Sequence, residues 1–332
     1  MRYFGSKVST LDRVYELISQ RLGSGSLCDP FGGVGIVGSF FKRKGYSVWC
    51  GDILTFAHYF QIVRVEETST PAFKTLCKAI KLSSPHEIVD LLNESEGTES
   101  WFTKQYAKNR SFFTVENAMR IDHCRLLIEE WSKNLWLDYT ERAYLLASLI
   151  NSMDRVANTA GTYYAYLKSW HRKAVKPFKF ELINCTQGNP DCHSFLCEAK
   201  NLVSLRPYDI IYLDPPYNER CYTRYYHLPE TIALGETPEI HGMSGMPNTT
   251  RSGSAYNENG KAKNALRELV ERAQFKLLAF HYSRSGIISP EEILQILSPY
   301  GRIQIFDIDS KGYTTKQVPR IVKHSLYLVQ NG

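Results

Sequence analysis

The stretch SLCDPFGGVGIVGSFFKRKGYSVWCGDI (26–53) constrains the fold more than any other part of the sequence. A short apolar run reaches Asp29, a glycine-rich turn and a segment with helical spacing follow, and a second apolar run ends at Asp52. This order predicts strand, turn, helix and strand, and such a βαβ unit implies a parallel sheet. The run YDIIYLD (208–214) is almost continuously apolar, which is typical of a central parallel strand covered on both faces.

Other segments predict single elements from the spacing of their apolar residues. Helices are expected at 10–22, 263–273 and near 290–297. Strands are expected at 179–189 and 275–283, and the runs 301–309 and 324–330 are expected to pair antiparallel. The stretch 235–262 is rich in Gly, Ser, Thr, Asn and Pro, so it predicts a long mobile loop.

Between about 55 and 178 the pattern becomes mainly helical. This segment is too long for a simple crossover between strands, so it predicts an inserted lobe. We therefore expect an α/β fold with a Rossmann-like sheet, built from 1–54 and 179–332, and a helical lobe at 55–178.

Composition narrows the class of protein. The chain has 332 residues, and 43% of them are hydrophobic, which is enough for a substantial core. No apolar run approaches the roughly 20 residues of a membrane span, and the N-terminal ten residues lack the apolar region of a signal peptide, so we expect a cytoplasmic protein without a membrane partner. Eight cysteines fit no zinc pattern, which predicts reduced thiols and no metal site.

The net charge of +6 is a weak signal, but basic residues cluster with aromatic ones in two places. The first cluster comprises Lys168, His171, Arg172, Lys173, Lys176 and Lys179 around Trp170 and Phe178. The second comprises Lys104, Lys108 and Arg110 beside Trp101, Phe102, Tyr106, Phe112 and Phe113. Such clusters suit contact with phosphates and bases, although a solvated helix face over ordinary core aromatics explains either one equally well.

The motif DPPYN (214–218) leaves the predicted central strand. Pro215 and Pro216 make this exit rigid, because each fixes its own φ and neither donates to a sheet ladder. The Asp214 carboxylate and the proline carbonyls accept hydrogen bonds and donate none, so they suit the two hydrogens of an amino group, and Tyr217 suits stacking on its ring. The alternative is a stiff loop with a solvated acid and a packing tyrosine.

The motif DPFGGVG (29–35) belongs to the same predicted sheet edge, where doubly wound folds bind ligands. Its glycines allow close approach of a ligand to the backbone at the start of a helix, and Asp52 is placed for a ribose diol. A nicotinamide cofactor is the competing ligand. The loop is not GxGxxG, however, and an acid before the glycines suits a cationic ligand better than a pyrophosphate.

The motifs RYFGSK (2–7), DPFGGVG, GDI (51–53) and DPPYN occur in the order found in Dam-like adenine-N6 DNA methyltransferases. The segments NSMDRVANTAGTYYAYLKSW (151–170) and DPPYNERCYTRYYHLPETIA (214–233) resemble the FokI-type branch of modification methylases. The resemblance implies a site-specific enzyme of a restriction-modification system with S-adenosylmethionine as cofactor. It also implies direct methyl transfer to the N6 amine of an adenine flipped out of double-stranded DNA.

The resemblance also implies roles for individual residues. The expected cofactor-binding residues are Tyr3, Phe4, Gly5, Lys7, Asp29, Phe31, Gly33, Gly35, Asp52 and Ile53, with Asn189 or Asp191 at the cofactor adenine. The expected catalytic residues are Asp214, Pro215, Pro216 and Tyr217, and His281 and Tyr282 are expected to be structural. The expected DNA contacts are Lys168, Arg172, Lys173, Lys176, Asn218, Arg220, Tyr222 and Arg224.

Other functions stay open on the sequence. The chain could instead methylate the N4 amine of cytosine in DNA, or an amino group of RNA or protein, because these amines pose the same chemical problem as the N6 amine of adenine. A noncatalytic DNA-binding relative is a different class, against which the intact Asp29, Asp52, Asp214 and Tyr217 speak. We expect a monomer that acts on duplex DNA, with a cognate restriction endonuclease as a further partner.

Overall fold

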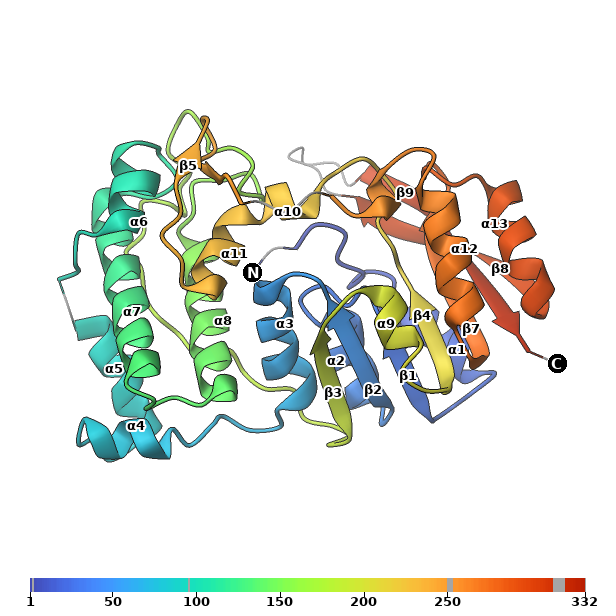
Figure 1. The fold of residues 1–332 in the computed structure, drawn as a ribbon, viewed down its shortest axis with the longest axis horizontal. Helices are drawn as coiled ribbons and strands as arrows, with labels where there is room; N and C mark the ends of the chain where they lie inside the picture. The colour runs from blue at the N-terminus through green and yellow to red at the C-terminus, as the bar shows by residue number, and fades with distance from the viewer. Residues whose placement is uncertain (2, 95, 250–252, 313–319, 332) are drawn as a thin grey trace. The chain divides into compact units, whose positions relative to one another are not determined.

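The computed structural model describes residues 1, 3–94, 96–249, 253–312 and 320–331. The chain divides into two compact units (Figure 1). The sheet unit comprises Gly5–Thr68, Thr186–Tyr222 and Ser252–Gly332. The helical unit comprises Met1–Phe4, Ser69–Cys185 and Thr223–Arg251.

The sheet unit contains a seven-stranded sheet with the order β3-β2-β1-β4-β7-β9-β8. The strands are β1 (Ser26–Asp29), β2 (Ser47–Asp52), β3 (Cys192–Leu196), β4 (Tyr208–Leu213), β7 (Phe275–Ser283), β8 (Arg302–Gly312) and β9 (Arg320–Gln330). The five strands from β3 to β7 pair in parallel, and β9 is antiparallel to both of its neighbours. The predicted α/β fold with a mostly parallel, Rossmann-like sheet is confirmed, as is the antiparallel pair at the end of the chain.

Helices cover both faces of this sheet (Figure 1). The helical segments of the unit are α1 (Leu11–Ser19), α2 (Ile36–Arg43), α3 (Thr55–Gln61), η1 (Ile62–Glu66), α9 (Ala199–Val203), η3 (Ala255–Asn257), α12 (Ala262–Arg272), α13 (Pro290–Leu297) and η4 (Ser298–Tyr300). Helices α1 and α2 pack on one face with Ile210, whereas α9, α12 and α13 pack on the other with Ile211. Successive side chains of β4 therefore enter opposite cores, which explains its unbroken apolar sequence.

The helical unit is built around two long helices. Its helical segments are α4 (Lys74–Ala79), α5 (Pro85–Glu94), α6 (Trp101–Thr103), η2 (Lys104–Lys108), α7 (Val115–Lys133), α8 (Tyr139–Arg155) and α11 (His227–Leu234). The short α10 (Tyr222–Tyr225) begins at the boundary of the units, and β5 (Ile240–His241) pairs antiparallel with β6 (Met246–Pro247). Helix α8 starts with a capping box in which Asp138 and Glu141 each accept from the other's main-chain N–H.

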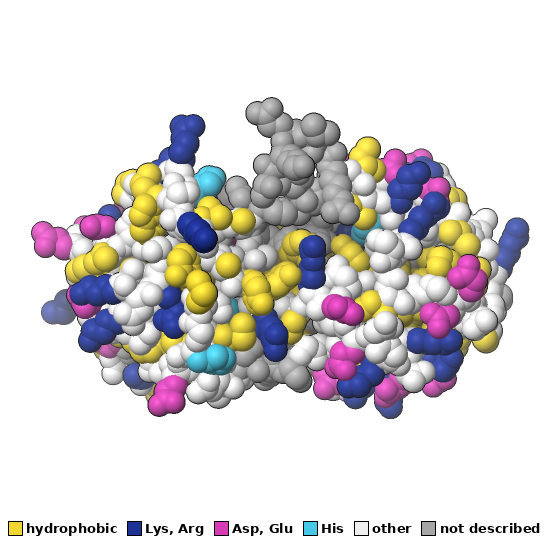
Figure 2. Space-filling model, turned by 90° about the horizontal axis from the view of Figure 1, so that it is seen from above, with side chains coloured by type: hydrophobic (Ala, Val, Ile, Leu, Met, Phe, Trp, Pro, Cys, Tyr) yellow, Lys and Arg dark blue, Asp and Glu magenta, His cyan; other side chains and the backbone are white. Residues whose placement is uncertain are grey.

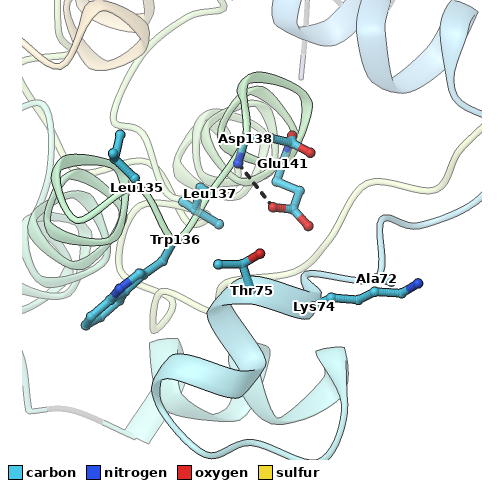
Figure 3. A pocket seen from close by; sticks show the side chains of 8 residues that line it. All are labelled: Ala72, Lys74, Thr75, Leu135, Trp136, Leu137, Asp138 and Glu141. Carbon is cyan, nitrogen blue, oxygen red and sulfur yellow. Dashed lines mark hydrogen bonds between the residues drawn. The ribbon is translucent and has the colours of Figure 1, made fainter.

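A surface pocket of about 330 Å³ lies where α4 meets the turn between α7 and α8 (Figure 3). Thr75, Trp136 and Leu137 line it together with the capping pair of α8. None of the residues predicted to bind cofactor or DNA lines this pocket.

Two predicted elements differ from the structure. The segment 179–189 forms no strand, because its main-chain N–H groups are bonded to side chains instead: Phe180 N donates to Asn93 Oδ1 (2.9 Å) and Glu181 N to Ser152 Oγ (3.0 Å). Strand β3 begins later, at Cys192. The predicted loop 235–262 contains the β5–β6 hairpin and η3, although residues 250–252 lie outside the described part of the chain.

The boundaries between the two units also differ from the predicted bounds of the inserted lobe, residues 55 and 178. Helix α3 and η1 belong to the sheet unit, where Val65 of η1 packs into the core beside α2. Residues 223–251, which the sequence assigns to the catalytic part, belong to the helical unit. Within the described ranges, no helix is both long and apolar enough to cross a membrane.

Candidate active site at the carboxyl edge of the sheet

Three acids lie at the carboxyl ends of three neighbouring strands. Asp29 ends β1, Asp52 ends β2, and Asp214 directly follows β4. Because β2, β1 and β4 are adjacent and parallel, their ends meet at one edge of the sheet. This is the edge at which open α/β sheets bind ligands.

Asp29 is almost fully buried, and its Oδ1 has no hydrogen-bond partner among the described residues. Burial, and to a smaller extent the neighbouring Asp214 carboxylate, raises the pKa of its carboxyl to about 8. A buried carboxylate in such surroundings is stabilised by a positive charge. Asp29 therefore fits the binding of a cationic group.

The glycine-rich turn brings the backbone close to these acids. Gly35 is the N-cap of α2 and has a φ of 76°, a conformation that glycine adopts without strain. The Asp52 carboxylate accepts hydrogen bonds from Gly33 N (3.1 Å) and Leu54 N (2.9 Å), which fixes its orientation. A carboxylate has capacity for further hydrogen bonds, so Asp52 can still accept from hydroxyl groups.

Two half-buried side chains flank this turn. Phe31 meets the ring of Tyr256 edge-on, with centroids 5.0 Å apart. Ile53 directly follows Asp52. Both lie in the sheet unit, beside the acids that they were predicted to accompany.

Only one carboxylate oxygen of Asp214, Oδ2, has a bonding partner among the described residues. Lys7 Nζ lies 2.5 Å from Asp214 Oδ2 and also donates to Gly5 O (3.2 Å). Asp214 Oδ1 is buried and has no partner among the residues that the structure describes. Burial raises the pKa of the Asp214 carboxyl, and the Lys7 ammonium opposes that rise. The pairing of Lys7 with Asp214 of the DPPYN motif was not anticipated from the sequence.

The ring of Tyr217 is held by two edge contacts. Its centroid lies 6.1 Å from that of Tyr282 on β7 and 5.4 Å from that of His324 on β9. The main-chain carbonyl of Tyr217 accepts a hydrogen bond from Ile287 N (3.1 Å). Pro215 is buried and Pro216 half-buried, so the motif is fixed on several sides.

The buried His281 also belongs to these surroundings. Its Nδ1 lies 2.7 Å from the Tyr212 hydroxyl, and its ring meets that of His324 at 5.1 Å. Burial lowers the pKa of both histidines, that of His324 to about 4. Both rings are therefore neutral at physiological pH, which agrees with a packing role for His281.

Tyr3 and Phe4 belong to the helical unit, whereas Gly5 and Lys7 belong to the sheet unit. The ring of Tyr3 stacks on Tyr226 with centroids 5.0 Å apart, and Phe4 N donates to the Tyr226 hydroxyl (2.7 Å). Their role at the cofactor stays a prediction.

The prediction that Asn189 or Asp191 reaches the cofactor adenine has to be corrected. Both precede β3, and Asp191 Oδ2 accepts from the hydroxyl of Ser47, the first residue of β2 (2.9 Å). They therefore lie at the amino end of the parallel strands, opposite to Asp52. The prediction was wrong because it placed the strand at 179–189, whereas β3 begins only after Asp191.

The residues that follow β3 were missed. Cys197 N donates to Asp52 O (3.0 Å), so Cys197 and Glu198 lie beside Asp52 at the carboxyl edge. The alternation in CHSFL (192–196), with its buried Cys192 and Ser194, is the sequence signal that could have revealed this strand.

The predicted DNA-contact residues of the helical unit differ from one another in exposure and in hydrogen bonding. Lys168, Arg172, Lys176 and Arg224 are exposed. Lys173 is half-buried, and its Nζ donates to Asp154 O (2.8 Å), so it contributes to the fold of its own segment. In the second basic cluster, Phe102, Tyr106, Phe112 and Phe113 are core residues, and Lys108 pairs with Glu99 (2.7 Å).

The remaining predicted contacts, Asn218, Arg220 and Tyr222, belong to the sheet unit. Asn218 Oδ1 accepts from Arg220 N (3.1 Å), and Asn218 O accepts from Asn257 Nδ2 (2.8 Å), which stiffens the chain after the motif. Arg220 is exposed.

No group of His, Cys, Asp and Glu in the described ranges is arranged to hold a metal ion. All eight cysteines lie in the described ranges and are thiols, not halves of disulfides.

Comparison with known proteins agrees with this geometry. The family model of D12 class N6 adenine-specific DNA methyltransferases matches residues 3–295. The type II methyltransferase M.FokI of Planomicrobium okeanokoites is 35% identical over 319 residues, which are 94% of this chain and 49% of that protein. The modification methylase StsI of Streptococcus sanguinis is 30% identical over 328 residues, 98% of this chain and 50% of that protein.

A shorter relative matches over almost its whole length. The type II methyltransferase M.NlaIII of Neisseria lactamica is 27% identical over 321 residues, 94% of this chain and 92% of that protein. The chain thus spans about half the length of M.FokI and StsI. The family match includes the glycine-rich turn, Asp52 and the DPPYN motif, and the chain therefore belongs to the D12 class N6 adenine-specific DNA methyltransferase family.

Proposed function

We propose that this protein transfers a methyl group from S-adenosylmethionine to the N6 amine of an adenine in double-stranded DNA, as a site-specific enzyme of a restriction-modification system. One observation carries the proposal: Asp214 Oδ1 is a buried acceptor without a partner among the described residues, held by Lys7 through the other oxygen. The family match and the type II relatives support it.

The residues at the carboxyl edge fit the cofactor. S-Adenosylmethionine carries a sulfonium and an ammonium group, and the orphaned, buried carboxylate of Asp29 suits such positive charge. Asp52 would accept from the ribose hydroxyls, and Phe31, Gly33, Gly35 and Ile53 would line the same site. When bound, the cofactor supplies a methyl group activated by the positive sulfur.

Asp214 and Pro215 would prepare the target amine. The lone pair of an exocyclic amine is delocalised into the base, which makes the amine a poor nucleophile. A hydrogen bond from the amine to Asp214 Oδ1, and a second one to the Pro215 carbonyl, would favour the pyramidal amine and orient its lone pair. Positioning and electrostatics then supply the acceleration, without a covalent bond between enzyme and substrate.

Tyr217 would hold the ring of the target base. A base inside a duplex must leave the stack before chemistry, and stacking on an aromatic side chain compensates part of that cost. The two edge contacts with Tyr282 and His324 keep the ring of Tyr217 in a fixed plane. This arrangement favours stacking over hydrogen bonding by the hydroxyl.

The helical unit would bind the DNA. Lys168, Arg172 and Lys176 are exposed cations on one segment, beside the exposed Trp170. Cations in this arrangement neutralise phosphates, and their contribution does not depend on base sequence. A monomeric state and a cognate restriction endonuclease stay predictions.

The decisive experiment incubates the protein and S-adenosylmethionine with duplex DNA from a methylation-free host, then identifies the modified nucleosides by mass spectrometry. N6-methyldeoxyadenosine is expected, and single-molecule sequencing of the same DNA would read its sequence context. Structured RNA is a parallel substrate. N4-methylcytosine as the product, transfer to RNA alone, or no transfer at all would contradict the proposal.

A further inference from the structure

The glycine-rich turn of the sheet unit (32–35) lies against the helix that follows β2. Helix α3 continues directly into the π-helical turn η1, and such turns within α-helices often occur at functional sites. A Cβ on Gly32 would lie 3.0 Å from Gln61 Nε2, and one on Gly35 would lie 3.3 Å from Val65 Cγ2. The turn therefore requires glycine partly because this helix packs so closely against it, and not only for the approach of a ligand.

Two side chains of this helix bind the main chain of the turn. Gln61 Nε2 donates to Gly33 O (2.8 Å), and Arg64 Nη1 donates to Val34 O (2.7 Å). Because Asp52 accepts from Gly33 N (3.1 Å), Gly33 is held at both of its main-chain groups. Gln61 and Arg64 are three residues apart, so their side chains leave the same face of the helix. One helix face thus fixes two consecutive carbonyls of the turn.

The helix that carries these two side chains is itself held on two sides. Lys42 of α2 is fully buried, and its Nζ donates to Glu67 O (2.8 Å) and Glu66 O (3.3 Å) at the end of η1. On β3, Ser194 N donates to Glu66 Oε1 (2.5 Å). The two donors to the turn therefore extend from a rigid support, and groups on rigid elements define a site more closely than groups on loops.

Packing alone does not explain a glutamine at position 61. Gln61 is fully buried, and its Oε1 has no hydrogen-bond partner among the described residues. A buried amide oxygen without a partner is destabilising, and an apolar side chain of similar size would avoid that cost. What an apolar side chain lacks is the donor that holds Gly33 O. The bond from Nε2 to the turn is therefore the distinctive contribution of Gln61.

Arg64 differs from the cations of the protein surface. On the face seen in Figure 2, Lys and Arg side chains project outward. Arg64 is half-buried instead, and its guanidinium lies 4.9 Å from the centroid of the Phe60 ring. Burial lowers the pKa of Arg64 to about 10, so its side chain is still charged at neutral pH. A charged donor forms a stronger hydrogen bond than a neutral one, which suits Arg64 to holding the Val34 carbonyl.

We propose that Gln61 and Arg64 are positioning residues that hold the glycine-rich turn in the conformation that binds S-adenosylmethionine. The turn connects β1, which ends at Asp29, to α2, and its Gly33 N bonds Asp52. A shift of the turn would therefore disturb both acids that are expected at the cofactor. A ligand that binds only one of several conformations loses apparent affinity in proportion to the population of that conformation. This inference rests on the proposed function and assigns residues to its cofactor-binding step.

The first test is Gln61→Met, which removes the donor and keeps a side chain of similar length. The exchange eliminates the unpaired Oε1 but leaves Gly33 O without its donor, so the free energy of unfolding in urea should change little. The Kd for S-adenosylmethionine, measured by calorimetry, should rise about tenfold, as expected if the turn keeps its binding conformation about one-tenth of the time. The KM for the cofactor should rise in parallel, whereas kcat at saturating cofactor should stay near the wild-type value.

Arg64→Met tests the same inference from the half-buried position, and it decides the matter if Gln61→Met does not fold. It should also raise the Kd for S-adenosylmethionine. Arg64→Lys keeps a charged donor and should restore most of the affinity. Arg43→Met is the matched control, because Arg43 is an exposed arginine of α2 in the same unit, and this variant should bind the cofactor as the wild type does.

Hydrogen exchange of the cofactor-free protein provides a readout that does not depend on activity. The main-chain amides of residues 30–38 should exchange faster in Gln61→Met and Arg64→Met than in the wild type, and saturating S-adenosylmethionine should remove the difference. An unchanged Kd in the folded variants, a lower kcat at saturating cofactor with an unchanged Kd, or faster exchange throughout the sheet unit would overturn the inference. If the wild type binds the cofactor but methylates no DNA, the proposed function fails, while the Kd values of the variants still decide the inference. If the wild type does not bind the cofactor, both fail.

Discussion

Lys7 Nζ lies 2.5 Å from Asp214 Oδ2, which joins two motifs that are 207 residues apart in the sequence. The ion pair fixes one carboxylate oxygen and leaves the other, Oδ1, for a ligand. It also lowers the pKa of a carboxyl that burial raises. Lys7 therefore acts on the proposed amine acceptor itself, in addition to any contact with the cofactor.

Asp214→Ala should abolish methyl transfer, because it removes the acceptor that orients the amine. We expect kcat to fall by at least about 100-fold, the range found for single transition-state donors and acceptors, while the Kd for S-adenosylmethionine changes little. Asp191→Ala is the matched control, since Asp191 is exposed at the opposite edge of the sheet. Near-normal transfer by Asp214→Ala, measured at saturating cofactor, would contradict the mechanism.

Lys7→Met should move the acid limb of the pH–rate profile to higher pH. The Lys7 ammonium opposes the rise of the Asp214 pKa, so its removal lets protonation begin at a higher pH. The measurement is kcat/KM for DNA at saturating S-adenosylmethionine, between pH 5 and 9. Lys7→Arg keeps the charge and should leave the limb in place, and an unshifted limb in Lys7→Met would show that the ion pair does not tune Asp214.

Asp29→Asn should stabilise the cofactor-free protein at alkaline pH. Burial raises the pKa of Asp29 from 3.8 to about 8, so the folded state holds a proton that the unfolded state loses above pH 4. The free energy of unfolding therefore falls as the pH rises from about 4 to about 8, and each pKa unit corresponds to about 1.4 kcal/mol. The neutral amide of the variant does not titrate, so its free energy of unfolding should not fall in this way. Urea unfolding of both proteins at pH 5 and pH 8 would measure the difference.

The same Asp29→Asn variant should bind S-adenosylmethionine more weakly, because it lacks the negative charge that attracts the sulfonium and ammonium groups. Calorimetric titration gives the Kd. S-Adenosylhomocysteine, which lacks the sulfonium charge, should lose less affinity. A variant that binds both ligands as the wild type does would rule out Asp29 as a cation site.

Tyr217→Phe should keep most of the activity, whereas Tyr217→Ala should lose about tenfold or more, since stacking of a base on an aromatic ring is worth about 1–3 kcal/mol. His324→Ala removes one of the two rings that hold Tyr217 and should give an intermediate loss, which His324→Phe restores. The readout is kcat together with the fluorescence of 2-aminopurine at the target position. A Phe variant as damaged as the Ala variant would assign the role to the hydroxyl instead.

Lys168→Ala and Arg172→Ala should each weaken DNA binding to a similar degree for all sequences. Each should also reduce the slope of log K against log salt concentration by about one, as expected for one phosphate contact. Lys133→Ala is the control, because this exposed lysine lies at the end of α7 and outside the basic segment. Binding titrations between 50 and 200 mM salt, a range chosen for its large electrostatic effect, would measure the slopes.

The sequence by itself determined the central βαβ unit and the acids at its strand ends. The apolar run of β4 predicts burial on both faces, and Ile210 and Ile211 do enter opposite cores. Gly35 marks the turn because its left-handed backbone favours glycine. These features depend on local sterics and on the spacing of apolar residues. Both can be read from residues that are neighbours in the sequence.

The tertiary structure decided what those local rules leave open. Whether 179–189 forms a strand depended on Asn93 and Ser152, distant side chains that bond its N–H groups, and this moved Asn189 and Asp191 to the wrong end of the sheet. The pairing of Lys7 with Asp214 likewise depends on which segments become neighbours. Hydrogen bonds and ion pairs between remote residues have no period in the sequence, so only the folded chain reveals which groups satisfy one another.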